Sequence, residues 1–281
     1  GTLKQVTFSY FCNTCKSTHY FTKFVFILIK KQLKNKVALI TFQYHQNINF
    51  EPLINSLKDF ITEVFILSFD EKPVINGITN QNAKIISCFD FNIKKSFQNV
   101  LEQSDADWFL LLTPYDVIDD VILKDLESFV TNNSTNNICL AFKKKTFFID
   151  EYINYSSLST LTETVLYSKE AFVNYFISDS SVSLKINESK YIMPYNLYQD
   201  YDQFNLVLTI NAKSQAFKQY QQDEKVSFIK IFFSPFITFI KELFLKKCLF
   251  NGFKGLILAN LLAFRTLKVN LFLWMQYRHI E

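Results

Sequence analysis

The stretch between residues 107 and 120 constrains the fold of this chain more than any other part of the sequence. Residues 107–112 read Asp-Trp-Phe-Leu-Leu-Leu, a short run that is apolar after its first position. A run of this length and composition is typical of a strand that is buried on both faces. It stops at Thr113-Pro114, because proline cannot continue a central strand, and a cluster of carboxylates begins at Asp116. In a β/α pattern, acidic residues at the end of a buried strand are typical of enzymes that hold a metal ion against a nucleotide diphosphate.

Further apolar runs accompany that strand, and helical patterns separate most of them. The predicted strands cover residues 37–41, 63–68, 83–87 and 138–142, and the predicted helices cover residues 50–60, 93–103 and 119–130. Strands that alternate with helices at this spacing predict a mostly parallel, doubly wound α/β sheet.

In sheets of this kind ligands bind outside the carboxyl ends of the strands. We therefore expect one cleft at that edge, with polar residues from several strand ends around it. These residues are Thr41, Ser68, Ser87 and Thr113, with Asp70 and Asp116 beside them.

The rest of the chain changes character twice. Residues 143–198 hold short β-type runs between polar turns, which predicts hairpins or a mixed sheet edge. From residue 201 onward the pattern is helical again, and Pro235 is expected to interrupt or start a helix there. We therefore expect an N-terminal extension over residues 1–35, the α/β domain over 36–200 and C-terminal helices over 201–281.

The charge is concentrated at the C-terminus. Residues 226–281 carry eight Lys or Arg and two Glu, a net charge of +6, whereas the whole chain carries only +4. Basic residues alternate there with Leu, Ile and Phe at helical spacing, which favours an anionic membrane surface as partner over nucleic acid. The chain has only four Gly, which argues against a Gly-rich phosphate loop.

The N-terminal extension holds Cys12 and Cys15 with His19, half of the ligand set of a zinc site. The other half is missing, so an irregular segment is the favoured interpretation. The six apolar residues 24–29 are far fewer than the roughly 20 needed to span a bilayer, and Arg265 and Lys268 interrupt the apolar pattern of the tail. We therefore expect no membrane-spanning segment and no signal peptide.

Three segments resemble family 2 glycosyltransferases. Residues 101–108 read Leu-Glu-Gln-Ser-Asp-Ala-Asp-Trp, which closely resembles the Leu-Glu-x-Ala-x-Gly-Asp-Trp of that family. Residues 63–68 are similar to its Glu-Ile-Ile-Val-Val-Asp segment, and residues 37–41 look like its first strand. The resemblance implies the GT-A nucleotide-sugar-binding fold.

The tail extends the resemblance. Pro235, the segment 249–264 and Leu273-Trp274 are similar to the helical C-terminus of lipopolysaccharide-core glycosyltransferases. The likeness therefore covers about residues 36–281, and it implies a C-terminal helical extension on the GT-A domain.

The resemblance assigns roles by position. The family's Asp that contacts the nucleotide base aligns with Ser68, and Asp70 is the nearby substitute. The family's Asp-x-Asp positions fall on Thr113 and Tyr115, so a divalent cation, Mg²⁺ or Mn²⁺, is left to Asp116. The residues expected to bind the nucleotide sugar are Thr41, Ser68, Asp70, Thr113 and Tyr115.

The family's general base, in a His-Glu pair, aligns with Ser178-Asp179, so Asp179 is the expected catalytic carboxylate. A family His near the return strand aligns with Tyr195. Asp105 and Asp107 precede the strand that follows them and are expected to lie at its amino end, away from the cleft.

Several charged positions keep two interpretations. The lysines at residues 143–145 either neutralise a diphosphate or form a solvated strand end or turn, which the charge pattern favours. Asp116 serves either the cleft or a helix cap. Asp119 and Asp120 are expected to be first-turn carboxylates that meet a helix dipole.

The resemblance implies inverting transfer of a sugar from a nucleotide sugar to a lipid-linked glycan of the lipopolysaccharide or cell-envelope type. The expected location is cytoplasmic, peripheral at the inner face of the cytoplasmic membrane. The alternative is a catalytically inactive relative that acts as a binding or scaffold protein at the membrane, because Ser68, Thr113 and Tyr115 replace family carboxylates.

Overall fold

The computed structural model describes residues 35–44, 48–70, 83–88, 92–133, 136–178, 183–196 and 201–279. The chain divides into two compact units, residues 1–35 and 36–281, and the second is described here. Cys12, Cys15 and His19 lie outside the described residues, so the half zinc site stays untested.

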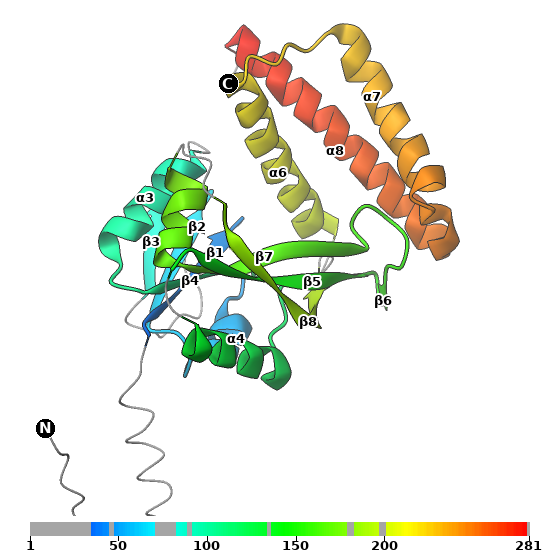
Figure 1. Cartoon of the computed structure of the whole chain (residues 1–281). Coiled ribbons are helices and arrows are strands. Elements are labelled where there is room, and N and C mark those ends of the chain that lie inside the picture. The colour runs from blue at the N-terminus through cyan, green and yellow to red at the C-terminus, as the bar shows by residue number, and fades with distance from the viewer. Residues whose placement is uncertain are drawn as a thin grey trace, which may run out of the picture. The chain divides into compact units, whose positions relative to one another are not determined.

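A single mixed sheet forms the centre of the second unit (Figure 1). Its strands are β1 (Val37–Gln43), β2 (Glu63–Ser68), β3 (Ala83–Ser87), β4 (Trp108–Leu111), β5 (Ile138–Phe148), β6 (Glu151–Tyr152), β7 (Thr160–Ser168) and β8 (Lys185–Asn196). The strand order is β3-β2-β1-β4-β7-β5-β6, and β8 pairs with β5.

The first four strands run parallel to their neighbours. Beyond β4 the sheet is mixed: β7 runs antiparallel to both β4 and β5, β6 is antiparallel to β5, and β8 is parallel to β5. The predicted α/β class with a parallel-rich sheet and a helical C-terminus is confirmed, and the predicted mixed edge corresponds to β5–β8.

Helices cover both faces of the sheet. On one face α2 (Glu51–Leu57) and α4 (Asp120–Asn132) pack against Val37, Leu39, Trp108 and Leu110. On the other face α3 (Ile93–Gln103) and α5 (Lys169–Phe172), which continues into the π-helix η1 (Val173–Ile177), pack against Ala38, Ile40 and Phe109. Successive side chains of β1 and β4 therefore pack alternately into two hydrophobic cores, one on each face of the sheet, as expected of strands buried on both faces.

The helix α4 begins as predicted. Asp119 is its N-cap, and its Oδ1 accepts hydrogen bonds from the backbone N–H groups of Val121 at 3.0 Å and Ile122 at 2.8 Å. Asp120 lies in the first turn, where a carboxylate meets the positive end of the helix dipole.

The C-terminal part consists of α6 (Tyr201–Gln221), α7 (Phe228–Ile240), the short π- and 3-10 helices η2 (Lys241–Leu245) and η3 (Cys248–Asn251), and α8 (Gly252–Arg278). They lie side by side in Figure 1. Pro235 neither starts nor ends a helix but lies inside α7, whose hydrogen-bond ladder loses one N–H donor there. Phe148 of β5 packs with Phe204 of α6 and Leu258 of α8 in a third core cluster.

Gly255 allows α8 to approach η3. A Cβ atom at this position would collide with the backbone oxygen of Cys248. The Cys248 thiol in turn lies 3.2 Å from the backbone oxygen of Gly255. Cys248 is fully buried, so the backbone at this corner has little room to shift.

We expect Gly255→Ala to lower the free energy of unfolding by about 1–3 kcal/mol, because the added methyl group overpacks against backbone. Ala normally stabilises a helix interior relative to Gly by about 1 kcal/mol, so the sign is diagnostic. Urea unfolding followed by circular dichroism measures it. The matched control is Asn260→Ala at an exposed position of the same helix, which should leave stability unchanged or slightly raised. A stabilised Gly255→Ala protein would contradict the close approach.

Candidate functional site

The carboxyl ends of four parallel strands meet at one edge of the sheet. Gln43 of β1 is in register with Ser68 of β2, and Ser68 with Ser87 of β3. Leu112, which follows β4, donates its N–H to the Ile40 oxygen of β1 at 3.1 Å. The strand order reverses between β1 and β4, because the chain continues from β1 to one side of the sheet and returns to β4 on the other. Such a switch point is where open α/β sheets bind ligands.

A cavity of about 570 Å³ lies at this switch point. It is lined by the segments that follow β1 and β4. Its polar residues include Asn49, Ser56, Asp116 and Asn196. The side-chain oxygen of Asn196 is buried without a hydrogen-bond partner. A volume of this size suits a small-molecule ligand, and an unsatisfied amide oxygen at its wall favours a ligand with hydrogen-bond donors.

Aromatic rings stand beside the cavity. The Tyr44 ring lies 5.8 Å from that of Phe69 and 6.2 Å from that of Tyr115, with the planes nearly parallel in both pairs. Phe42 extends the stack, at 6.4 Å from Phe69. Burial and the nearby Tyr115, Asp116 and Glu163 raise the pKa of Tyr44, so its phenol keeps its proton. Tyr44, Phe69 and Tyr115 follow the ends of β1, β2 and β4, whereas Phe42 lies within β1. Of these residues only Tyr115 is a predicted site residue.

Asp116 is held in the loop after β4. Its Oδ2 accepts hydrogen bonds from the backbone N–H of Thr113 at 2.7 Å and from the Thr113 hydroxyl at 2.9 Å. The loop itself is fastened to β8, because Val117 donates to the Pro194 oxygen at 3.0 Å and Asn196 donates to the Tyr115 oxygen at 2.9 Å. The cleft interpretation of Asp116 is therefore supported by position, and helix capping is left to Asp119.

Lys144 forms an ion pair with the carboxylate of Asp116. The Lys144 Nζ lies 2.7 Å from Oδ1 and 2.9 Å from Oδ2 of Asp116, and 2.8 Å from Oε2 of Glu163. The side chains of Asp116 and Lys144 are 0% and 2% exposed, whereas Glu163 is 47% exposed. Glu163 is therefore the solvent-exposed member of this network.

The electrostatics of this network follow from burial and charge. Burial alone would lower the pKa of Lys144, but the carboxylates of Asp116 and Glu163 raise it above its ordinary value. Burial raises the pKa of Asp116, and Lys144 together with the hydrogen bonds from Thr113 offsets part of that rise. Lys144 therefore keeps its positive charge, and the ionised form of Asp116 depends on that charge.

The favoured interpretation of residues 143–145 as a solvated strand end or turn is wrong for Lys144. The strand β5 continues through them for 11 residues. Phe142, Lys144, Thr146 and Phe148 are all buried, whereas Lys143 is exposed. This period-two alternation was the available signal, because it places Lys144 on the inner face with two phenylalanines.

A divalent cation does not fit the carboxylate that was expected to hold it. Both oxygens of Asp116 face Lys144 at hydrogen-bond distance, and its side chain is inaccessible to solvent. In the described part of the chain, no group of three or more His, Cys, Asp or Glu is arranged to hold a metal ion. No chemical step is therefore assigned to a metal.

The other predicted residues have varied outcomes. Thr41 is buried within β1, which continues to Gln43, and its hydroxyl has no hydrogen-bond partner. The Ser68 hydroxyl accepts the N–H of Asp70 at 3.2 Å, so it shapes the turn after β2. Asp179 lies outside the described residues, and its role as base stays a prediction. Tyr195 forms an isolated backbone bridge with Asp116.

The pair Asp105 and Asp107 lies at the opposite end of β4, as expected. The Asp107 carboxylate accepts the backbone N–H of Lys36 at 3.0 Å, next to the start of β1. Neither residue lines the cavity at the switch point.

Comparison with known proteins identifies no family. No protein-family profile and no curated protein matches the chain. Among solved structures, TarS of S. aureus is similar over 69% of this chain with 16% identity and a TM-score of 0.34, and the chain spans 44% of that TarS chain. TarS 1–349 is similar over 87% of this chain and 92% of its own length, with 14% identity and a TM-score of 0.36, and a further structure of it contains UDP.

A CMP:2-keto-3-deoxy-manno-octonic acid synthetase complexed with CTP is similar over 55% of this chain and 90% of its own length, with 10% identity and a TM-score of 0.33. These scores are low. The fold class rests instead on the strand order and the two-sided helix packing.

We expect Lys144→Met to lower the free energy of unfolding by about 3–5 kcal/mol at neutral pH, because Asp116 is left as a buried charge without its partner. The variant should be more stable in acid than at neutral pH. Without the lysine, burial holds the folded pKa of Asp116 above the unfolded value, and the stability that this provides is lost as the pH rises through the folded pKa. Urea unfolding at a series of pH values measures both effects.

The matched control is Lys143→Met, which removes the same charge from the exposed neighbour. It should change stability by no more than about 0.5 kcal/mol and show no acid stabilisation. Equal losses in the two variants would mean that Asp116 and Lys144 do not form the buried pair.

Proposed function

We propose that this chain is a glycosyltransferase-like protein that binds a nucleotide sugar in the cavity between the segments after β1 and β4. The single observation that carries the proposal is the position of that cavity, at the switch point of a parallel-rich sheet and beside the loop that replaces the Asp-x-Asp motif. The resemblance of residues 37–41, 63–68 and 101–108 to family 2 glycosyltransferases supports it. The proposed donor is a nucleotide sugar, and the proposed acceptor is a lipid-linked glycan of the cell envelope. The sugar is transferred with inversion at its anomeric carbon.

The chemistry requires two groups that the cavity must supply. A departing diphosphate needs positive charge near it, and the acceptor hydroxyl needs a carboxylate within hydrogen-bond reach. Asp179 is proposed as that base. If a divalent cation takes part, it has to be carried mainly by the phosphates, because Asp116 is engaged by Lys144.

A catalytically inactive relative is the second candidate, and a specific observation favours it. The carboxylates of Asp116 and Glu163 outnumber the one ammonium group of Lys144 beside the cavity. This network therefore adds no net positive charge for a diphosphate. Such a protein would bind a nucleotide sugar or a partner enzyme at the membrane without turnover.

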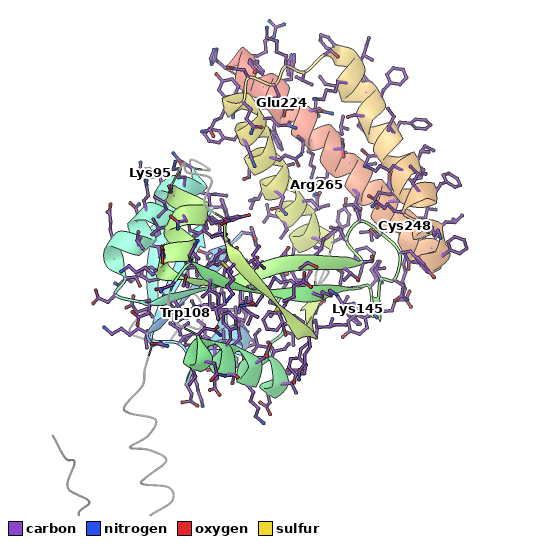
Figure 2. The ribbon with its side chains drawn as sticks, viewed as in Figure 1. Lys95, Trp108, Lys145, Glu224, Cys248 and Arg265 are labelled. Atoms are coloured by element: carbon purple, nitrogen blue, oxygen red, sulfur yellow. The ribbon has the colours of Figure 1, made fainter. Side chains whose placement is uncertain are left out.

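Peripheral membrane contact through the C-terminal helices is also part of the proposal. Large apolar side chains are exposed along α7 and the corner that leads into α8, and Figure 2 shows rings standing away from the outer side of α7. They include Phe228, Ile229, Phe232, Phe233, Phe236, Ile237, Phe244, Leu245, Leu249, Phe250 and Phe253. Lys241, Lys246 and Lys247 are exposed among them, as on helices that lie in an anionic interface.

One stretch of the described chain, Cys248–Arg278, is long and apolar enough to cross a membrane by length and composition, and 44% of its most apolar window is buried against the rest of the protein. The expectation of no spanning segment was based on interruption by Arg265. We propose the inner face of the cytoplasmic membrane as the location, with the helices on its surface.

Val117→Trp is expected to abolish nucleotide binding while leaving the fold intact. Val117 is 46% exposed and lines the cavity, so an indole there fills space that the ligand needs. Isothermal titration with UDP and GDP, each with Mn²⁺ and with a chelator, measures binding. Val121→Trp is the matched control, because Val121 is 47% exposed on α4 and does not line the cavity.

The two candidate functions separate in the same samples. Binding together with release of sugar from a nucleotide-sugar donor identifies the transferase, and binding without release identifies the inactive relative. The absence of binding of both UDP and GDP to the unmodified protein would overturn nucleotide binding in the cavity, which both candidate functions share.

Phe232→Ser is expected to weaken binding to vesicles of phosphatidylcholine and phosphatidylglycerol by about tenfold to a hundredfold, because burial of a Phe side chain in lipid stabilises the bound state by roughly 1.5–3 kcal/mol. Co-sedimentation of the full chain with vesicles measures it. Tyr201→Ser is the control, since Tyr201 is an exposed aromatic residue at the start of α6. Equal effects of the two changes, or no vesicle binding by the unmodified chain, would contradict membrane contact through α7.

A further inference from the structure

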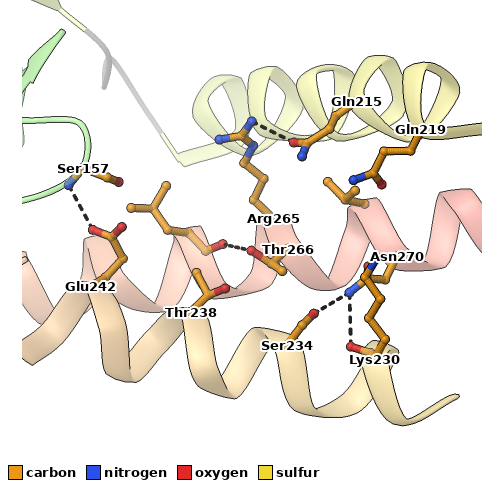
Figure 3. Close-up of a pocket in the computed structure, with 12 residues that line it drawn as sticks. Ser157, Gln215, Gln219, Lys230, Ser234, Thr238, Glu242, Arg265, Thr266 and Asn270 are labelled. Carbon is orange, nitrogen blue, oxygen red and sulfur yellow. Dashed lines mark hydrogen bonds between the residues drawn. The ribbon is translucent and has the colours of Figure 1, made fainter. Parts of the chain in front are cut away.

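The helix α7 has its polar face turned inward. Lys230, Ser234, Thr238 and, one turn further in η2, Glu242 follow one another at every fourth position and line a cavity between the C-terminal helices (Figure 3). The remaining positions of α7 are mostly apolar and exposed. In a helix on a water-soluble core the apolar stripe faces inward, so this arrangement is reversed.

The cavity measures about 370 Å³ and is polar on all three sides. The helix α6 contributes Gln215 and Gln219, and α8 contributes Arg265, Thr266 and Asn270 (Figure 3). Asn270 is engaged, because it donates hydrogen bonds to the Lys230 backbone oxygen at 3.3 Å and to Ser234. The space left open by these contacts is bordered by groups with unused hydrogen-bonding capacity.

Arg265 is the main such group. Its guanidinium donates one hydrogen bond, to the amide oxygen of Gln215 at 3.2 Å, and its Nε is buried without a partner. The side-chain oxygen of Gln219 is likewise buried without a partner. Among the described residues no carboxylate pairs with Arg265; Glu242, the acid in the lining, accepts instead from the backbone N–H of Ser157 at 3.0 Å.

A second cation lies one turn further along the same helix. Lys268 donates to Asn205 at 2.6 Å and to Thr209 at 2.7 Å, both of which are neutral groups of α6. Burial lowers the pKa of both Arg265 and Lys268. The α6–α8 interface therefore holds two positive charges with neutral partners, and Arg265 is the one of them that lines the cavity.

We propose that the cavity between α6, α7 and α8 binds the phosphate group of an anionic lipid through Arg265. A guanidinium pairs well with phosphate because its donors form a rigid fork that holds two oxygens at once. The apolar outer side of α7 argues for a lipid as the source of the phosphate, because the same helix offers its polar stripe to the head group and its aromatic residues to the acyl chains. The inference rests on the proposed membrane contact and is independent of the nucleotide cavity.

The test compares the full chain on two kinds of vesicle, phosphatidylcholine alone and phosphatidylcholine mixed with phosphatidic acid. We expect tighter binding to the second kind, and we expect Arg265→Gln to reduce that preference by about tenfold, the value of a charge-assisted hydrogen bond. Arg278→Gln is the matched control, because it removes the same charge from an exposed position in the last turn of α8.

Gln215→Glu tests whether the loss of binding in Arg265→Gln is caused by loss of the fold. It places a carboxylate where Arg265 already donates a hydrogen bond, so it should leave the melting temperature unchanged within a few degrees and at the same time abolish the preference for phosphatidic acid. Loss of binding in a protein that keeps its stability distinguishes a ligand site from a structural arginine.

The outcomes are separable. Equal losses in Arg265→Gln and Arg278→Gln, or an unchanged preference in Arg265→Gln, would overturn the proposal in favour of diffuse attraction. Stabilisation by inorganic phosphate that depends on Arg265, without any preference for phosphatidic acid vesicles, would overturn the lipid source. Binding to phosphatidylcholine alone that depends on Phe232 reports the membrane contact by itself, so its failure is distinguishable from failure of the cavity site.

Discussion

The ammonium group of Lys144 is the interaction on which the candidate site depends. It joins β5, through its own backbone, to Asp116 in the loop after β4 and to Glu163 in β7. These segments are neighbours only because β7 inserts antiparallel between β4 and β5. A buried pair of this kind costs desolvation that its Coulombic attraction only partly offsets, so it is better understood as fixing one arrangement than as adding stability. In this chain the Lys144–Asp116 pair fixes the loop after β4. The corresponding loop holds a metal in the glycosyltransferase family that the sequence resembles.

Much of the fold was predictable from local pattern. The strands around residues 37–41, 63–68 and 83–87 lie where apolar runs predict them. The first two are buried on both faces, whereas the third is an edge strand in which only Ile86 is buried. The amino-end position of Asp107 followed from strand direction alone. The strand order at the mixed edge of the sheet was harder to predict from the sequence. The strand β7 pairs with β4 and β5 across long sequence separations that no local pattern specifies.

The site was predictable in place but not in chemistry. Asp116 does lie at the carboxyl edge, yet its partner Lys144 is 28 residues away and belongs to a run of three lysines whose charge suggested a surface. Period-two alternation through Phe142, Lys144 and Thr146 predicts that Lys144 is buried, whereas the run of three charges predicts that it is exposed. The same ambiguity affects α7: periodicity defines a polar stripe and an apolar stripe, and only tertiary packing decides which one faces inward.

The cavity at the switch point and the cavity between α6, α7 and α8 differ in the sign of the charge beside them, and this difference bears on function. At the switch point, Asp116 and Glu163 face one lysine, so the local network is net negative and a diphosphate there must bring its own counter-charge. Between the C-terminal helices, Arg265 and Lys268 have neutral partners, so that region is net positive. An anionic group is therefore better accommodated by the helical part than by the sheet. Asp116, the carboxylate that remains at the switch point, is enclosed by Lys144, so the charge distribution places anion recognition in the C-terminal helices.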